Sequence, residues 1–347
     1  MVTRDEARSA SSGPGPHAEV AAHGADEIVK VLAAHGSEAG HYSVLGPDPW
    51  RVIWNDDHSG FVSFLEEGRC VLSWRSPVAA PEDQGELVGR LIDYARASDR
   101  HLLAVVVNAA THAAGVAKGM IGTWIGTECY LDLPTWSLEG GRRQKVRWAR
   151  SHASRLGFTW RESYPLRDGH DFAELARIEE LWKEERPERR TDSFLRNSFT
   201  ELAHLRRYFV CQGPSGIVAS VSCTPISARG WYLQDPVRAT DAPRGALEGA
   251  MSLALETFRD EGYAVASNGP LPFWRPDGAT ETTQPLGILG TRVQRYFDSR
   301  YRFQHINQFR SKFVADSVSA LYVLRSHRLV TPGVARSLTR LLTQPAR

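Results

Sequence analysis

Matching landmarks recur in the two halves of the sequence in the same order, and this recurrence limits the folds open to the chain. Three pairs of residues lie roughly 160 residues apart, a spacing the length of a domain and not of a solenoid repeat. The pairs are Gly60 with Gly216, Pro81 with Pro243, and Asn108 with Asn268. We interpret them as two copies of one unit, although any chain that alternates strands and helices shows some recurrence. At 347 residues the chain is long enough to bury two cores.

Each copy predicts three antiparallel strands, a long helix and one further strand. In the first copy, apolar runs predict strands at 51–54, 61–65 and 70–74, a helix that begins at Pro81 with Leu87, Leu91, Ile92 and Ala95 inward, and a strand at 102–108. In the second, they predict strands at 207–211, 217–224 and 231–234, a helix from Pro243 to about Asp260, and a strand at 263–267. This is the element order of the acetyltransferase (GNAT) fold. We therefore expect an α+β fold of tandem, duplicated GNAT-like units joined by a basic helix.

The remaining segments complete a division into five parts. Residues 1–27 mix charge with Ser, Gly and Pro and lack an apolar run, which predicts a disordered tail and not a signal peptide. The other parts are a first unit at 28–135, a connecting basic helix and strand at 136–165, a second and catalytic unit at 166–325, and a basic C-terminal helix at 326–347. Within the second unit, a helix is predicted from Asp171 to about Glu184.

Composition removes several classes of protein. A mean hydropathy of −0.35 and the lack of a long apolar run argue against a membrane-spanning helix. The cysteines are scattered without metal spacing, so we expect reduced core residues in a cytoplasmic protein. They are Cys70, Cys129, Cys211 and Cys223. The 12 histidines form no HxxxH or CxxH arrangement, so no metal site is predicted.

The segment from Arg142 to Arg161 is strongly basic in a nearly neutral chain. It holds seven basic residues and no acidic one, whereas the formal net charge of the chain is only +2. A solvated surface helix is the ordinary explanation, but such helices mix signs and form i,i+4 pairs. Without acidic partners, this helix is predicted to bind a polyanion, because guanidinium groups hold phosphates through two hydrogen bonds. The candidate residues are Arg142, Arg143, Lys145, Arg147 and Arg150.

The loop after the strand at 231–234 indicates whether the chain could use acetyl-CoA as an acyl donor. In the GNAT fold this loop holds a cofactor pyrophosphate at a helix N-terminus, and it usually needs several glycines so that the backbone can approach closely. Here Gly245 is the only glycine, Pro243 and Arg244 precede it, and Asp241 would repel a diphosphate. The loop therefore argues against a standard acetyl-CoA site.

Asp235 and Arg238 end that strand at the place where the fold puts its reaction centre. We expect both to line one cleft. A turn-initiating aspartate before Pro236, with Arg238 as its partner, explains the spacing equally well.

Several stretches together resemble the C-terminal catalytic domain of phosphatidylglycerol lysyltransferases and its soluble relatives. The resemblance covers roughly 42–322 and rests on "VLSWRSPVAAPED", "LPTWSLEGGRRQKVRWARSHASRLGFTW", "LQDPVRATDAPRGALEGAMSLALETFRDEGY", "SNGPLPF" and "YFDSRYRFQHINQFRSKF". The resemblance implies two GNAT-like units joined through a basic helix. It also implies aminoacyl-tRNA as the donor in place of acyl-CoA, so that no further cofactor is expected and the basic helix faces the tRNA acceptor arm.

The resemblance also implies roles for single residues. Asp235 and Arg238 match the family's Asp-x-x-Arg and are the catalytic candidates. The substrate-binding candidates are Asp241, Arg244, Asn268 and Lys312. The sequence departs from the family in a shorter turn after Arg238, in Gly141 where a lysine is common, and in the residues that follow Phe313. These departures bear on which acceptor and which amino acid the resemblance implies, and less on the class of donor.

The resemblance leaves the acceptor open between two classes. Lysyltransferases that act on lipid carry transmembrane helices, which this chain lacks, so we expect a small-molecule acceptor, with a lipid surface less favoured. The model for this expectation is the seryl-tRNA-dependent transferase of valanimycin formation, an antibiotic-pathway relative that aminoacylates a hydroxylamine. Aminoacyl-tRNA-dependent modification of phosphatidylglycerol or another lipid, acyl-CoA N-acyl transfer, and RNA binding without catalysis are the alternatives.

Overall fold

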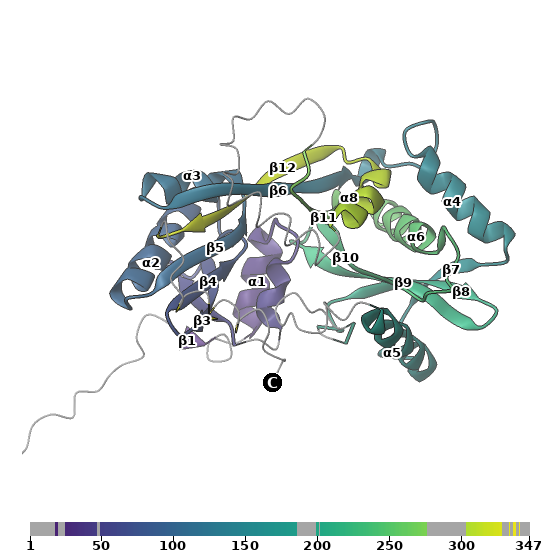
Figure 1. Ribbon diagram of the computed structural model, residues 1–347, viewed down its shortest axis with the longest axis horizontal. Helices are drawn as coiled ribbons and strands as arrows, with labels where there is room; N and C mark the ends of the chain where they lie inside the picture. Colours follow the sequence, from purple (N-terminus) through teal and green to yellow (C-terminus); the bar gives the residue numbers. More distant parts are fainter. Residues whose placement is uncertain are drawn as a thin grey trace, which may run out of the picture.

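One mixed sheet of twelve strands runs through the molecule, in the order β1-β2-β3-β4-β5-β12-β6-β11-β10-β9-β8-β7 (Figure 1). The computed structural model describes residues 18–19, 25–46, 49–185, 199–200, 202–275 and 303–327, with Gly333, Arg336, Ser337 and Arg340. The strands are β1 (Ala18–Glu19), β2 (Arg51–Trp54), β3 (Phe61–Glu67), β4 (Cys70–Trp74), β5 (His101–Val107), β6 (Ile121–Asp132), β7 (Thr159–Ser163), β8 (Arg207–Gly213), β9 (Gly216–Ile226), β10 (Gly230–Arg238), β11 (Val265–Pro272) and β12 (Ser317–Arg325).

Helices connect and cover these strands (Figure 1). The helices are α1 (Ala25–His35), α2 (Gln84–Ala97), α3 (Ala109–Ala117), α4 (Gln144–Arg155), α5 (Gly169–Glu184), α6 (Ala246–Asp260) and α8 (Phe303–Arg310). Short 3₁₀ turns are η2 (His41–Leu45), η3 (Leu133–Thr135) and η5 (Ser311–Phe313). Of the predicted tail, Ala18–Glu19 pairs with β2 and Ala25 begins α1. The rest of that tail, and most of the predicted C-terminal helix, lie outside the described residues.

The two halves of the sheet repeat one topology. In the first half β2, β3 and β4 are antiparallel, and β5 returns through α2 to lie parallel to β4. In the second half β8, β9 and β10 are antiparallel, and β11 returns through α6 to lie parallel to β10. The predicted α+β fold of two GNAT-like units is therefore confirmed.

The halves also exchange their last strands. β12, from the second half, lies between β5 and β6, and β6, from the first half, pairs with β11. The two units thus share one continuous sheet, and the boundaries proposed at residues 135 and 166 remain predictions. The sequence reading did not predict β6, β12, α1 or α3. Asn108, which it placed in a strand, instead caps α3, because its side chain accepts a 2.8 Å hydrogen bond from the Thr111 amide.

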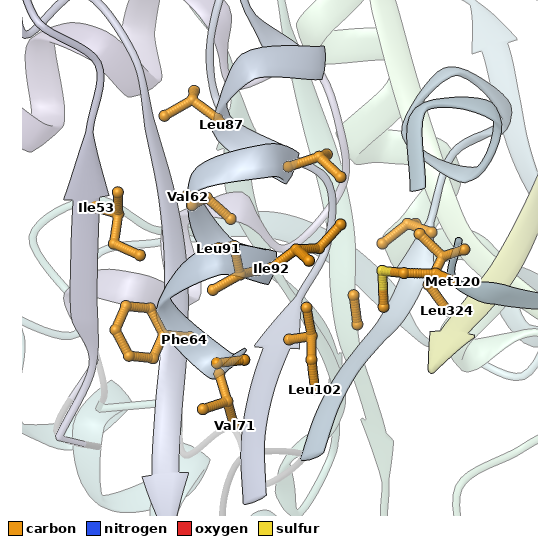
Figure 2. Close-up of a cluster of buried hydrophobic side chains, with 14 of the residues drawn as sticks. Ile53, Val62, Phe64, Val71, Leu87, Leu91, Ile92, Leu102, Met120 and Leu324 are labelled. Carbon is orange, nitrogen blue, oxygen red and sulfur yellow. The ribbon is translucent and has the colours of Figure 1, made fainter. Parts of the chain in front are cut away.

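A hydrophobic core lies beneath the long helix of each half. The residues predicted to face inward from α2 are all buried, namely Leu87, Leu91, Ile92 and Ala95. They pack on sheet residues such as Phe64 of β3 and Val71 of β4 (Figure 2). In the second half, Phe258 of α6 stacks on Trp231 of β10 with ring centroids 4.9 Å apart. Truncating one buried leucine to alanine in such a core costs about 2–5 kcal/mol.

The centre of the sheet holds a buried polar network instead of apolar packing. The Arg75 guanidinium, directly after β4, lies 2.6 Å from the carboxylate of Glu128 in β6, and both side chains are buried. Glu38, between α1 and η2, accepts a 2.6 Å hydrogen bond from the side-chain amide of Asn108. Burial alone would raise the pKa of Glu38, but His41 and Arg75 outweigh burial and lower it to about 2. These charges therefore depend on one another for stability.

Candidate functional site

The parallel pair β10–β11 separates just before Asp235. The two strands pair only from Gly230 to Tyr232, after which β11 pairs with β6 alone. A bulge in β10 between Leu233 and Asp235 redirects the strand at the same point. Beyond it, β10 is paired only with β9, so the end of β10 is freed to contribute side chains to a site.

Asp235 lies in a small, partly open pocket between this strand end and α5. Its Oδ2 oxygen accepts hydrogen bonds from Arg206 Nη1 at 2.8 Å and from Ser222 Oγ at 3.3 Å. No hydrogen bond from the described residues reaches its Oδ1 oxygen. Burial raises the pKa of the Asp235 carboxyl, and the opposing effect of the Arg206 guanidinium is smaller. The group is therefore a stronger base than an ordinary aspartate, and one of its oxygens has no partner among the described residues.

Arg206 is a site residue that the sequence analysis missed. Its side chain is only 1% exposed, and Nη1 also donates a 2.9 Å hydrogen bond to Ser222 Oγ. The residue stands just before the predicted strand at 207–211, and nothing in the local sequence ties it to a residue 29 positions later. Its signal is structural, because a buried guanidinium needs a carboxylate partner.

Arg238 does not share this pocket, so the prediction of one cleft for Asp235 and Arg238 is wrong. Asp235 pairs in register with Ser222, on the face of the sheet that α5 covers. Arg238 pairs with Ala219, which packs in a cluster with Ala246 of α6 on the opposite face. Two residues three positions apart on a strand point to opposite faces. Arg238 is exposed, and it has no hydrogen bond or ion pair to the described part of the chain.

Helix α4 packs directly on the loop that precedes α6. Gly245 has a φ of 104°, and a Cβ there would lie 1.9 Å from the Ala149 carbonyl oxygen of α4. The Arg244 guanidinium lies over the indole ring of Trp148, 4.8 Å from its centroid. Asp241 is exposed beside this loop. The glycine therefore serves helix packing, at the position where the GNAT fold would need space for a pyrophosphate.

The two remaining substrate-binding candidates make internal contacts. Asn268, in β11, donates a 2.9 Å hydrogen bond to the Arg310 carbonyl, while its own buried Oδ1 lacks a partner among the described residues. Lys312 lies 2.8 Å from a carboxylate oxygen of Glu248 in α6. Among the described residues, the Asn268 Oδ1 oxygen therefore has no hydrogen-bond partner, whereas the Lys312 ammonium group is paired with Glu248.

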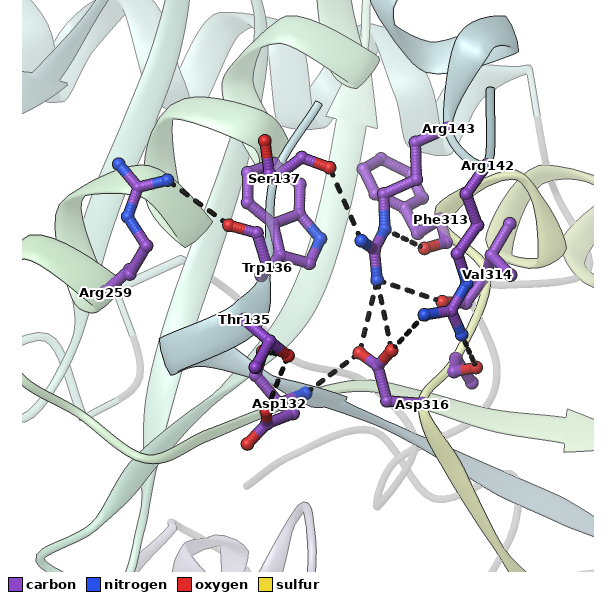
Figure 3. Close-up of polar contacts among 11 residues, drawn as sticks. Asp132, Thr135, Trp136, Ser137, Arg142, Arg143, Arg259, Phe313, Val314 and Asp316 are labelled. Atoms are coloured by element: carbon purple, nitrogen blue, oxygen red, sulfur yellow. Dashed lines mark hydrogen bonds and ion pairs between the residues drawn. The ribbon is translucent and has the colours of Figure 1, made fainter. Parts of the chain in front are cut away.

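The basic helix does have acidic partners, which corrects the prediction that it has none. Arg142 and Arg143 both pair with Asp316, at 2.6 Å and 3.1 Å (Figure 3). Arg150 pairs with Glu256 of α6 at 2.6 Å. These carboxylates lie more than 100 positions along the chain, so a local count of charges could not find them.

Arginine contacts to backbone carbonyls secure the start of α4 as well. Arg143 is 5% exposed and donates to the carbonyl oxygens of Phe313 and Val314, at 2.8 Å and 3.2 Å (Figure 3). Burial lowers the pKa of Arg143, and neighbouring Arg142 adds to the effect. Arg147 donates to the carbonyls of Leu138 and Gly140.

Two of the five predicted RNA contacts keep a solvent-facing charge. The side chain of Arg142 is 53% exposed although it is paired. Lys145 is exposed, and no described residue pairs with it. Of the five predicted contacts, Lys145 in α4 and Arg142 just before it are therefore the exposed ones, whereas Arg143 is buried.

Other chemistries find little support in the described part of the chain. It contains no group of three or more His, Cys, Asp or Glu residues placed to hold a metal ion. All four cysteines are free and buried, and burial raises the pKa of Cys70 to about 11 and that of Cys211 to about 12. Their thiols are therefore protonated near neutral pH. Across the described residues, no helix has both the length and the apolar character that crossing a bilayer requires.

Comparison with known proteins gives a consistent family and fold. The family model for the C-terminal domain of phosphatidylglycerol lysyltransferase matches residues 40–325. The C-terminal domain of a lysylphosphatidylglycerol synthetase from Agrobacterium fabrum is similar in structure, with a TM-score of 0.77 and 17% identity over 92% of this chain and 96% of that one. L-PGS from Bacillus licheniformis is also similar in structure, with a TM-score of 0.74 and 16% identity over 93% of this chain and 98% of that one.

A more distant similarity is to FemX, with a TM-score of 0.54 and 9% identity over 87% of this chain and 95% of that one. No curated protein matches the chain by sequence.

Proposed function

The chain belongs to the family of phosphatidylglycerol lysyltransferase C-terminal domains, an aminoacyltransferase family, and we propose that it transfers an amino acid from aminoacyl-tRNA to a small-molecule nucleophile. The acceptor is an amine or a hydroxylamine, and seryl transfer in natural-product biosynthesis is the favoured reaction. No cofactor is needed, because the aminoacyl ester is itself activated. The observation that carries the proposal is Asp235, a carboxylate of raised pKa in a pocket at the end of β10, whose second oxygen accepts no hydrogen bond from the described residues.

The chemistry asks the protein for positioning and for a proton acceptor. The acceptor nitrogen attacks the ester carbonyl carbon and loses a proton to the Asp235 carboxylate. The tetrahedral intermediate then collapses, the bond to the ribose oxygen breaks, and that oxygen leaves with a proton. Arg206 and Ser222 fix one carboxylate oxygen, so the other is held in place for the reaction. Positioning of this kind accounts for much of the acceleration of bimolecular steps.

The packing of α4 supports aminoacyl-tRNA over acyl-CoA as the donor. The GNAT fold holds a CoA pyrophosphate at the N-terminus of the helix that corresponds to α6. Here Gly245 at that N-terminus lies against the Ala149 carbonyl oxygen, which is a poor neighbour for a phosphate. Lys145 in α4 is exposed to an RNA backbone, and so is Arg142 just before the helix, although Arg142 is already paired with Asp316.

A lipid acceptor is the second candidate, favoured by exposed apolar side chains next to α5. Tyr164, Leu166 and Phe172 are 56%, 61% and 40% exposed. Tyr164 and Leu166 precede α5, and Phe172 lies in its first turn. Helix α5 covers the Asp235 pocket. Such residues could rest on a lipid surface.

One experiment separates the two acceptors. Total tRNA charged with labelled amino acids is incubated with the protein and either a panel of small amines and hydroxylamines or phosphatidylglycerol vesicles. The proposal expects label in small molecules with wild-type protein, and at least about a hundredfold less with Asp235→Asn. Label confined to the lipid extract would establish the second candidate. Label that Asp235→Asn transfers as fast as wild type would remove Asp235 from the reaction.

A further inference from the structure

One face of α4 carries an exposed tryptophan. Trp148 is 47% exposed, and its ring stacks on that of His152, one turn further along the helix, with centroids 5.4 Å apart and planes 5° apart. Helix α4 lies beside α6 (Figure 1), and the loop before α6 places the Arg244 guanidinium over the same indole, 4.8 Å from its centroid. Two elements therefore fix the orientation of an indole that remains half open to solvent.

The surroundings of this tryptophan are polar and basic. Lys145 lies one turn before it on the helix and Arg155 two turns after it, and both are exposed. Among the described residues, no carboxylate pairs with Lys145, Arg155 or Arg244. The loop that carries Arg244 holds one exposed acid, Asp241. The aromatic surface therefore lies in a region of excess positive charge.

This combination suits a single-stranded nucleic acid better than a duplex or a lipid surface. The bases of a single strand are free to stack on aromatic rings and guanidinium planes, while cations hold its phosphates. A duplex keeps its bases paired and would use the cations alone. A lipid surface needs a stripe of apolar residues. Of the twelve described residues of α4, Trp148 is the only exposed large hydrophobic one, and Leu156 follows at the C-cap.

We propose that Trp148, His152 and Arg244 form a stacking site for an unpaired base near the 3′ end of the donor tRNA. Lys145 and Arg155 then contact phosphates on either side of that base. The inference rests on the proposed aminoacyl transfer, because the RNA of that reaction has a single-stranded 3′ end. Stacking has little sequence preference, so the site would serve tRNAs of different identity alike. The RNA is then held by its unpaired end, next to the loop that precedes α6.

Fluorescence anisotropy with two hairpin RNAs tests the proposal. One hairpin copies a tRNA acceptor stem and ends in an unpaired A-C-C-A, and the other is the same stem with a blunt end. Wild-type protein should bind the overhanging hairpin more tightly. Trp148→Ala should weaken that complex by about five- to a hundredfold, the range for one stacked base, and should change binding of the blunt hairpin by less than about twofold. Trp148→Tyr should restore most of the affinity, because it keeps an aromatic ring.

Leu156→Ala is the matched control. It removes a side chain that is 53% exposed at the end of the same helix and has no ring, so both affinities should stay unchanged. Equal binding of the two hairpins by wild type, or equal weakening of both by Trp148→Ala, would overturn the inference. A Trp148→Ala protein that loses binding to phosphatidylglycerol vesicles and keeps its RNA affinity would also overturn it, since the face would then contact a membrane.

Transfer assays separate failure of the stacking site from failure of the proposed function. With charged tRNA as donor, Trp148→Ala should raise the KM for aminoacyl-tRNA and leave kcat within about twofold, as expected for a lost binding contact. Transfer with the same KM in wild type and Trp148→Ala would overturn the inference while the proposed function stands. Overhang-dependent binding by a protein that transfers no amino acid would refute the proposed function and leave the stacking site standing.

Discussion

Replacing Arg143 with alanine tests whether α4 is anchored by its arginines or presents them to RNA. The guanidinium contacts the carbonyl oxygens of Phe313, Val314 and Ser137 and the carboxylate of Asp316. Breaking a buried pair costs about 3–5 kcal/mol, because the partner is left unpaired. Asp316 keeps Arg142 as a second partner, so we expect the free energy of unfolding to fall by about 2–4 kcal/mol.

Urea denaturation and filter binding of total tRNA would measure the two effects separately. Lys145→Ala is the matched control, since Lys145 is exposed on the same helix and pairs with no described residue. It should change stability by less than about 0.5 kcal/mol. It should also weaken tRNA binding and reduce the salt slope of log K by about one. An Arg143→Ala protein with wild-type stability and weakened tRNA binding would refute the anchoring role.

Four further predictions follow from the site and the fold. Asp235→Asn should lower single-turnover transfer by about two orders of magnitude while circular dichroism stays unchanged, and retained transfer would exclude Asp235 as the base. The depressed pKa of Glu38 stabilises the fold above its ordinary value of 4.5, and this contribution is lost as the pH falls toward about 2. Acid unfolding should therefore shift to lower pH in wild type relative to Glu38→Gln, and coincident profiles would contradict the buried network. Gly245→Ala should destabilise the protein, because its Cβ would meet the Ala149 carbonyl at 1.9 Å, and an unchanged melting temperature would count against that packing. Transfer should survive chelation of divalent metals in single-turnover assays with purified aminoacyl-tRNA, and a loss restored only by zinc would refute this.

Local patterns predicted the repeated part of the fold well. Pro81 and Pro243 each precede a long helix by three residues, and the strands before them lie where the apolar runs are. The exchange of β6 and β12 was not predictable in this way. A strand that pairs with the opposite half forms its hydrogen bonds with residues far along the chain. Its own sequence does not indicate which strand it will pair with. Gly122 and Gly126 further weaken the strand pattern of β6.

The site was predictable in part for the same reason. The end of the predicted strand at 231–234 indicated Asp235 as a site residue. The alternation of side chains along a strand, however, already places Arg238, three positions later, on the opposite face of the sheet. Arg206 emerges only from a tertiary contact. For the basic helix, the local sequence predicted unpaired arginines. Their partners Asp316 and Glu256 are distant in the sequence, so a local count of charges did not include them.

A single competition between donors tests the central claim most directly. The protein is mixed with total tRNA carrying ¹⁴C-labelled amino acids and with ³H-labelled acetyl-CoA, together with the amine and hydroxylamine panel. The account predicts product that carries ¹⁴C, with no ³H above the level found without enzyme, and loss of that product in the Asp235→Asn protein. Product labelled with ³H alone would contradict aminoacyl-tRNA as the donor.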